Sequence, residues 1–499
     1  MSAAVAPADP FEGPRACVEE LIGWLEGTEA VGLTHGQLEE QLDRRGRELL
    51  RQLYQGQLDL RALREQRVPV SDVEGVRHGA VETGHVRPLS TVFGVVEVDR
   101  LAYRHRGHAN LYPADGRLNL PAERHSHGIR KLAAVEVSRG SFDEAAGAIG
   151  RQTGQPIGKR QVESLTARAA ADVEEFYTIR RVSPADKTDM LVISADGKGI
   201  VMRPDSLRPA TAAKAAAAST KLATRLSKGE KRNRKRLAEV GTVYHISPAP
   251  RTAADVMGPH EQNEPPAAAP TAKNKWVTAS VVDDAAEVLT AVFDEAERRD
   301  PKHQQTWVAL VDGNNHQIDR IKAEAAARGI EITIVIDFIH VLEYLWAAAW
   351  CFFAEGDPAA EDWVRHRALA VLDGAATAVA AGLRRRASTE RLSTQKRKKA
   401  DEAAKYLINK ADHLDYPTAL AAGSPIATGV IEGACRHLVK DRMDITGARW
   451  SAEGAEAVLK LRAVRTNGDF EEYWQYHLER ERQRIHTSRY LDGVVPAAA

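Results

Sequence analysis

The sequence predicts an α/β protein built on a mixed β-sheet, with a mainly helical region before the sheet and a large helical insertion within it. Residues 190–202 read MLVISADGKGIVM, an apolar run that ends in Asp196, and residues 307–312 repeat the pattern as WVALVD, ending in Asp312. An apolar run that delivers an acid at its end is a good scaffold for a metal-binding carboxylate. A single Asp-Gly more often only begins a turn, so it is the repetition that favours a site.

Composition sets the outer limits. The 499 residues are 43% hydrophobic and 28% charged, which is typical of an ordinary globular protein of two or more domains. The formal net charge is zero, so any affinity for nucleic acid must come from local charge. Three cysteines far apart argue against a disulfide scaffold or a zinc cluster and suit a reducing compartment. Neither a signal peptide nor an apolar run long enough to cross a bilayer is evident, so we expect no membrane association and a cytoplasmic, nucleoid-associated location.

Residues 1–80 are predicted to form an N-terminal helical region. Leucines recur at helical spacing between residues 37 and 65, while Gly46 and Gly56 interrupt the pattern and argue against one long coiled coil. The first fifty residues carry ten acids against four arginines, so DNA phosphates should repel them. Packing against the rest of the protein is the simpler interpretation, and dimerisation is the alternative.

Residues 81–185 are predicted to hold a small β-hairpin followed by short helices. Residues 90–104, STVFGVVEVDRLAYR, alternate in part between apolar and charged side chains, as strands do, and we expect an exposed hairpin there. Contact of its arginines with a DNA backbone is one interpretation, and a solvent-exposed sheet face is an equally good one.

Further along this region, the capping box Ser141-Phe-Asp-Glu144 starts one helix, residues 154–158 form a turn, and a further helix runs from about residue 159 to 177. Lys159 and Arg160 begin that helix, so the arrangement is compatible with a helix-turn-helix DNA reader. Many helical hairpins have the same pattern and bind nothing, so both readings stay open.

Residues 186–340 are predicted to form the first part of a catalytic core. The expected order is three strands, a helix, a strand, a helix and a strand, at residues 191–195, 200–203, 238–246, 281–299, 306–311, 316–328 and 331–336. The ribonuclease H-like fold has this order and takes one acid from the first strand, one from the end of the fourth and one from a closing helix. Asp196, Asp312 and Glu432 occupy those three places, with Glu432 in a predicted helix within residues 425–485.

Between these parts, residues 341–424 are rich in Ala, Leu, Arg and Lys and are predicted to be an all-α insertion. Two basic segments stand out in the neutral chain. Residues 214–236 carry nine basic residues against one acid, and residues 384–399 carry eight against one. Phosphate binding is one interpretation of such clusters, and a solvated helix face is the other.

Several spaced motifs together resemble the DDE transposases, and among them the ISKra-type insertion-sequence family. They are Asp196 after a strand, Asp312-Gly-Asn-Asn, Asp337-x-x-His340, the helical insertion, GVIEG around Glu432, and Arg449-Trp450. The resemblance covers roughly residues 85–480, and its specificity comes from the order of the motifs. It does not extend to the first eighty residues.

This resemblance implies a ribonuclease H-like domain that cuts transposon ends and joins them to target DNA. Asp196, Asp312 and Glu432 would be the catalytic, metal-binding triad, and Asp337 and His340 would support it. The implied cofactors are two Mg²⁺ ions, or Mn²⁺ in their place, which suit carboxylate ligands and in-line phosphoryl transfer. The implied partners are the terminal inverted repeats and target DNA, bound by a homo-oligomer. The residues expected to contact DNA are Lys159, Arg160, Arg234, Lys235, Arg236, Arg384, Arg385, Arg386, Arg436 and Lys440.

Two other functions remain open from the sequence. A ribonuclease H-like nuclease would cut DNA without joining it. A domesticated DNA-binding protein would keep the fold for binding alone, although such proteins usually lose an acid of the triad, and all three are present here.

Overall fold

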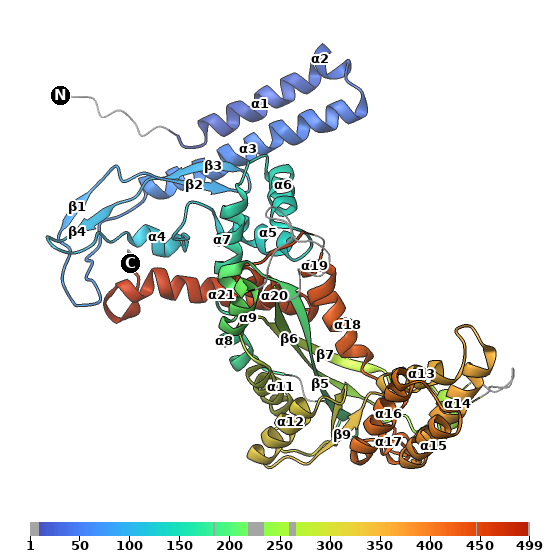
Figure 1. The fold of residues 1–499 in the computed structure, drawn as a ribbon. Coiled ribbons are helices and arrows are strands. Elements are labelled where there is room, and N and C mark those ends of the chain that lie inside the picture. The colour runs from blue at the N-terminus through green and yellow to red at the C-terminus, as the bar shows by residue number, and fades with distance from the viewer. Residues whose placement is uncertain (1–8, 183–184, 218–233, 259–265, 446, 498–499) are drawn as a thin grey trace, which may run out of the picture. The chain divides into compact units, whose positions relative to one another are not determined.

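The computed structural model describes residues 9–182, 185–217, 234–258, 266–445 and 447–497 (Figure 1). Its internal contacts divide the chain into two compact units. The first, which we call the N-terminal unit, consists of Met1–Thr178 together with Asp469–Ala499. The second, the sheet unit, is Ile179–Gly468.

The N-terminal unit begins with a helical hairpin. Helix α1 (Glu12–Glu26) packs against α3 (His35–Leu63), with the single turn α2 (Thr28–Val31) between them. Helix α3 runs unbroken through both of its glycines, so the predicted interruption is wrong. A Cβ at Gly56 would lie 2.5 Å from the main-chain oxygen of Pro10, so glycine here allows the start of α1 to lie against α3.

Two small antiparallel sheets follow. Strands β2 (Arg87–Thr91) and β3 (Gly94–Val98) form the predicted hairpin. It is not fully exposed, because its inner face shares a core with α3. The members of that core are Leu58, Leu89, Val96, Val98 and Leu120. Strand β1 (Ala80–Glu82) pairs with β4 (Ala102–Arg104).

The rest of the N-terminal unit is helical. Its helices are α4 (Pro113–Leu118), α5 (His127–Val137), α6 (Phe142–Thr153), α7 (Lys159–Ala169), α8 (Val173–Ile179) and α21 (Phe470–Ile485). The capping box at the start of α6 is present, with Ser141 Oγ accepting from the Glu144 amide at 3.1 Å. The helix expected over residues 159–177 is broken between α7 and α8. Asp172 lies in that break and accepts a hydrogen bond from His477 of α21 at 2.7 Å.

The sheet unit is built on one five-stranded mixed sheet with the order β7-β6-β5-β8-β9. Its strands are β5 (Met190–Val201), β6 (Lys235–Ile246), β7 (Ala272–Ser280), β8 (Trp307–Val311) and β9 (Ile332–Ile336). Strand β6 is antiparallel to both of its neighbours, whereas β5, β8 and β9 are parallel to one another. The predicted α/β class with a mixed sheet and a helical N-terminal region is confirmed.

Two strands differ from the prediction. The runs at residues 191–195 and 200–203 are not separate strands, because β5 pairs with β6 from Met190 to Val201 without a turn. Gly197 and Gly199 instead leave room for long side chains on β6. A Cβ at Gly197 would lie 3.0 Å from the side chain of Glu239, and a Cβ at Gly199 would lie 3.0 Å from that of Lys235. The third strand of the series is β7, which was not among the predicted strands.

Helices cover the sheet and close its ends. Helix α11 (Ala285–Arg299) packs on β5 and β6, and α12 (Asn315–Arg328) packs beside β8 and β9. Gly241 of β6 makes this possible, because a Cβ there would lie 2.3 Å from the side chain of Val292 in α11. Helix α20 (Ala452–Thr466) packs on β7, and α18 (Gly429–Ala434) packs on β5 and β6.

Between β9 and α18 the described residues form helices and no strand. These are α13 (Phe338–Phe352), α14 (Pro358–Leu372), α15 (Ala376–Thr389), α16 (Thr394–Asn409) and α17 (Tyr416–Ala421). Shorter helices elsewhere in the sheet unit are α9 (Pro209–Ala217), α10 (Ala253–Met257) and α19 (Asp441–Met443).

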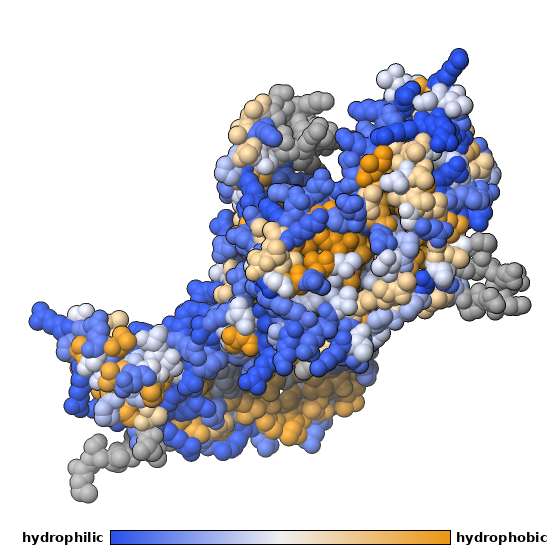
Figure 2. Space-filling model, turned by 90° about the horizontal axis from the view of Figure 1, so that it is seen from below, coloured by the Kyte–Doolittle hydropathy of each residue, from blue (hydrophilic) through white to orange (hydrophobic). Residues whose placement is uncertain are grey.

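The surface in Figure 2 is largely hydrophilic, with apolar side chains gathered in patches. Among the described residues, no helix has both the length and the apolar character needed to cross a membrane.

Candidate acidic site in the sheet unit

Asp196 and Asp312 lie at equivalent positions of two adjacent parallel strands. The ladder between β5 and β8 pairs residues 191–194 with residues 307–310, always 116 apart in sequence. Asp196 and Asp312 are also 116 apart, and each stands two residues beyond the last pair of the ladder. Asp196 was expected at a strand end, but β5 continues past it to Val201. The two acids therefore occupy corresponding positions where β8 ends and β5 continues.

The turn after β8 fixes Asp312. Its Oδ1 accepts a hydrogen bond from the Asn314 amide at 2.8 Å, and its main-chain oxygen accepts one from the Tyr406 hydroxyl at 3.2 Å. Gly313 has a φ of +91°, and a Cβ there would lie 2.8 Å from the Tyr406 oxygen. Only glycine fits this turn without strain. The Asp312 side chain remains exposed at its outer end.

The half-buried Asp196 is held on both of its oxygens. Oδ1 accepts from the Gly197 amide at 2.7 Å, and the Cys435 thiol donates to Oδ2 at 3.4 Å. Burial, together with the nearby Asp196 carboxylate, raises the pKa of the Cys435 thiol well above its usual range. Cys435 is therefore a neutral donor and not a thiolate at physiological pH. A carboxylate oxygen carries two lone pairs, so one such contact leaves it able to bind a cation.

Glu432 comes from the helix that faces these strands. It is an exposed residue of α18, and α18 continues directly into a π-helical turn, Cys435–Lys440. Such turns are rare and often occur at functional sites. This turn carries two of the predicted DNA-binding residues, Arg436 and Lys440.

One cavity of about 560 Å³ brings the three predicted acids together. Asp196, Asp312 and Glu432 all line it. The other charged or titratable groups on its wall are Lys198, His340, Cys435, Arg436 and Lys440. In the described part of the chain, the three carboxylates are not among the groups whose ligand atoms all lie within 4.8 Å of one another.

A fourth acid, which was not predicted from the sequence, lies near Asp196 and Asp312. Glu239 of β6 pairs with Gly197 and lines a second cavity of about 340 Å³ that also reaches Asp196 and Asp312. Burial and the Asp196 carboxylate raise the pKa of Glu239. The signal in the sequence was weak, because a glutamate in a strand gives no hint of the residue that it pairs with.

The predicted supporting pair divides into two different environments. Asp337 is fully buried and caps α13, where its Oδ1 accepts from the Ile339 amide at 2.9 Å. Its other oxygen accepts from the hydroxyl of Thr428, the residue before α18. His340 instead lines the larger cavity, with its Nδ1 3.1 Å from the Glu343 carboxylate. Asp337 therefore joins two helices, and only His340 reaches the cavity.

The remaining predicted DNA contacts are not among the residues that line the larger cavity. Lys159 and Arg160 are exposed at the start of α7 in the N-terminal unit. Of the segment 214–236, residues 218–233 lie outside the described residues. Arg234 precedes β6, while Lys235 and Arg236 begin it.

The arginines of α15 differ from one another. Arg384 and Arg385 are exposed. The guanidinium of Arg386 lies 4.5 Å and 4.6 Å from the ring centroids of Phe352 and Phe353 and forms an ion pair with Glu390. Arg386 therefore has packing partners within the helical insertion, and its contact with DNA stays a prediction.

The function has to be argued from this geometry. No family model matches the chain, and no curated protein matches it either.

Proposed function

We propose that the chain is a DDE-type DNA transposase, in which Asp196, Asp312 and Glu432 bind two divalent metal ions for phosphoryl transfer on DNA. The observation that carries the proposal is the meeting of these three acids, 116 and 120 residues apart in sequence, on the wall of one cavity. Acids chosen from sequence without regard to function would rarely converge in this way.

The strand order of the sheet also supports this proposal. Numbered in chain order, its strands run 3-2-1-4-5 with the second antiparallel to its neighbours, which is the arrangement expected of a ribonuclease H-like core. The first acid comes from strand one, the second follows strand four, and the third comes from a helix packed on strands one and two.

The donor set suits magnesium. All three candidate ligands are carboxylates, which Mg²⁺ prefers, and two of them are exposed enough to leave room for water and phosphate oxygens. Two ions about 3.5–4 Å apart would stabilise the entering and leaving oxygens of an in-line displacement. Such a pair spans more than a single ion does, so three ligands need not all lie within 4.8 Å of one another.

The other groups on the cavity wall fit a polyanionic substrate. Lys198, Arg436 and Lys440 place three cations around the acids, where they would neutralise phosphates next to the scissile bond. Cys435 fixes one oxygen of Asp196 by donating a hydrogen bond to it. His340 lies within the same cavity and would hold a phosphate or a water there.

Conservative variants test the proposal. A plasmid that carries the coding sequence with its native flanking DNA would be assayed for excision and insertion, with purified protein tested for Mg²⁺-dependent cleavage. Asp196→Asn, Asp312→Asn and Glu432→Gln should each lower both activities more than about 100-fold, beyond the loss expected for a residue that only supports a metal ligand. DNA binding should persist. Asp205→Asn, at an exposed position of the same unit, is the control and should change neither.

The same experiment separates the alternatives. Cleavage that depends on the three acids, without joining of a precut end bearing a 3′ hydroxyl, would indicate a nuclease. Binding without any cleavage by the unaltered protein would indicate a domesticated DNA-binding protein. Full activity in any one of the three variants would remove that acid from the triad.

A further inference from the structure

Two turns in the N-terminal unit bring a second set of metal-ligand side chains together, in a different unit from the acidic site. The first turn follows Ser71, which bridges to Arg77, and the second lies between the bridged residues Tyr103 and Leu111. Asp72 and His78 come from the first turn. His105 and His108 come from the second, where Gly107 has a φ of +87°.

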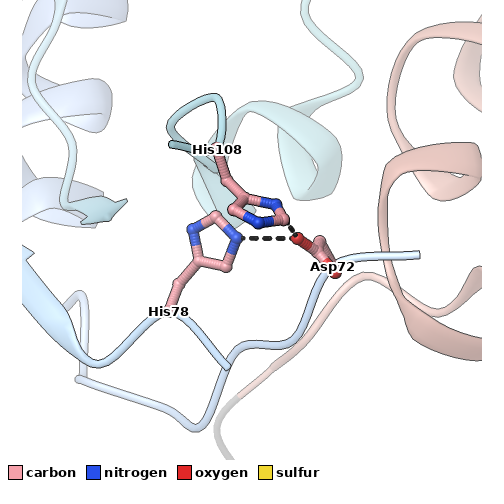
Figure 3. Close-up of side chains that lie close together, drawn as sticks. All are labelled: Asp72, His78 and His108. Atoms are coloured by element: carbon pink, nitrogen blue, oxygen red, sulfur yellow. Dashed lines mark hydrogen bonds and ion pairs between the residues drawn. The ribbon is translucent and has the colours of Figure 1, made fainter. Parts of the chain in front are cut away.

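Three of these side chains converge on one point (Figure 3). The Asp72 Oδ2 lies 3.1 Å from the Nε2 of His78 and 2.9 Å from the Nδ1 of His108. The three ligand atoms all lie within 4.8 Å of one another. The corners of a tetrahedron with centre-to-corner distances of 2.0–2.1 Å lie about 3.4 Å apart, so these separations are close to those of ligands around one zinc ion.

The hydrogen bonds of His78 favour a cation between these atoms. Its imidazole is fully buried, and its Nδ1 lies 3.2 Å from the main-chain oxygen of Tyr103. A carbonyl oxygen only accepts, so Nδ1 carries the proton. In the neutral ring Nε2 then offers a lone pair, and it faces a carboxylate oxygen, which also only accepts. A metal ion resolves this conflict, and the ring hydrogen bond from His78 to a main-chain carbonyl is the usual support of a metal-bound histidine.

The other two groups are oriented in the same way. The Oδ1 of Asp72 accepts from the amides of Glu74 at 3.0 Å and Val76 at 2.9 Å, which turns Oδ2 toward the histidines. The Nδ1 of His105 lies 3.1 Å from the main-chain oxygen of Arg77, so its Nε2 is the free ring nitrogen. The ring of His105 lies 5.2 Å from that of His108, centroid to centroid.

We propose that Asp72, His78 and His108 bind a structural zinc ion, with His105, whose ring neighbours that of His108, as the candidate fourth ligand. Imidazoles with one carboxylate suit Zn²⁺ and not Mg²⁺, which prefers oxygen ligands alone. The low cysteine count argued against a zinc cluster, but this ligand set contains no cysteine.

The surrounding fold explains why an ion is needed. The hydrophobic cluster around the two turns has only four buried members, Val70, Tyr103, Leu111 and Tyr490. A core this small gives little stability, and small modules commonly compensate with a disulfide or a metal. The chain's cysteines are all free in this structure, so the bound ion would join the two turns instead.

Zinc content and thermal stability of the full chain test the proposal. The purified protein, dialysed against metal-free buffer, should retain about one zinc per chain by elemental analysis. A strong chelator should lower the Tm of the N-terminal unit by roughly 5–10 °C, the shift for an ion at about 100 times its Kd. His108→Ala should lose the zinc and the response to chelator, and His108 suits substitution because its side chain is 31% exposed.

Two controls make the result specific. His85→Ala changes a histidine of matched exposure, 30%, in the same unit and should retain both the zinc and the response. Asp196→Asn should also retain the zinc, which separates this site from the acidic one. The proposal is overturned if the unaltered protein neither holds zinc nor gains stability on its addition. Equal zinc in the His108→Ala protein would overturn it as well.

Discussion

The hydroxyl of Thr428 donates a hydrogen bond to the carboxylate of Asp337, and through it the start of α13 is joined to the start of α18. Both residues are buried, and Glu432 lies one turn beyond Thr428. The position of one acid of the candidate site therefore depends on a contact made by two residues outside the triad.

Replacing Thr428 should separate positioning from chemistry. Thr428→Val keeps the shape but removes the donor, which leaves a buried carboxylate oxygen of Asp337 without this partner. We expect a loss of about 1–3 kcal/mol in the free energy of unfolding, measured with urea. DNA cleavage should fall while DNA binding is retained, because Glu432 loses its support. Thr428→Ser keeps the hydroxyl and should behave as the unaltered protein. A valine variant with reduced stability and normal cleavage would show that the contact is structural only.

The three cysteines should differ in reactivity. Burial raises the pKa of Cys351 and, together with Asp196, that of Cys435, whereas Cys17 is half-exposed. The thiolate is the reactive form, and an acid with a raised pKa stays protonated as the pH rises past its ordinary value. At pH 8, iodoacetamide should modify Cys17 at least about tenfold faster than Cys435, as followed by peptide mass spectrometry. Denaturant should abolish the difference. Fast modification of Cys435 in the native protein would mean that Asp196 lacks this donor.

Periodicity and spacing predicted much of the sheet unit, because buried parallel strands and amphipathic helices leave regular patterns. The same reasoning placed a turn at Gly197, where the chain continues as a strand. Glycine allows a turn, but it also allows a long side chain of the next strand to cross over it, and the sequence does not distinguish these cases. Glu239 was missed for the same reason, since its neighbours are set by strand register.

The site in the N-terminal unit was harder to predict. His78 and His108 are 30 residues apart, and no regular spacing links them to Asp72. Cysteine counting looks for one class of zinc ligand and misses a set made of histidine and aspartate. Only the pairing of two turns, which depends on tertiary structure, shows that these side chains meet.

Arg130 should contribute more to stability than a surface arginine of the N-terminal unit. It is fully buried in α5, with ion pairs to Glu123 and Glu481, the latter at 2.7 Å. Burial opposes ionisation of Glu481, but Arg130 and its neighbours hold the pKa of this carboxyl below its ordinary value. The stabilisation is therefore present at neutral pH and is lost as the pH falls below about 4.3, the ordinary pKa of glutamate.

Arg130→Ala leaves two acids without their buried partner, and we expect a loss of about 3–5 kcal/mol in the free energy of unfolding. Arg139→Ala removes an exposed arginine that pairs with Glu136, and it should change stability by less than about 1 kcal/mol. Chemical denaturation at pH 7 compares the two. Equal effects would mean that the Arg130 pairs contribute no more than surface ion pairs do.

DNA binding by α15 should depend on two of its three adjacent arginines. Each phosphate contact contributes about −0.9 to the slope of log K against log salt. Arg384→Ala with Arg385→Ala should therefore flatten the slope by about one to two units and weaken all sequences alike, measured by fluorescence anisotropy. Arg386→Ala should leave the slope unchanged and lower the Tm, because its guanidinium packs on aromatic rings. An unchanged slope in the double variant would make this face of α15 a solvated surface.

Sequence recognition should depend on α7 if the pair of α6 and α7 reads bases. Lys159 and Arg160 are exposed at the start of α7, and Lys159 lies 2.5 Å from Asp143 of α6. Replacing Lys159 and Arg160 with alanine should weaken binding to duplexes that carry the transposon-end sequence more than binding to scrambled duplexes. Contacts to nucleobases carry sequence specificity, and contacts to phosphates do not. Asp143→Asn removes the ion pair but keeps Lys159 and Arg160, so it should preserve the preference for end sequences. Because it also removes a negative charge, it should strengthen binding to both duplexes slightly. Competition anisotropy with the two duplexes at one salt concentration measures the ratio. Equal losses on both duplexes would mean that α7 contacts only the phosphate backbone, and recognition would then have to come from another surface of the chain.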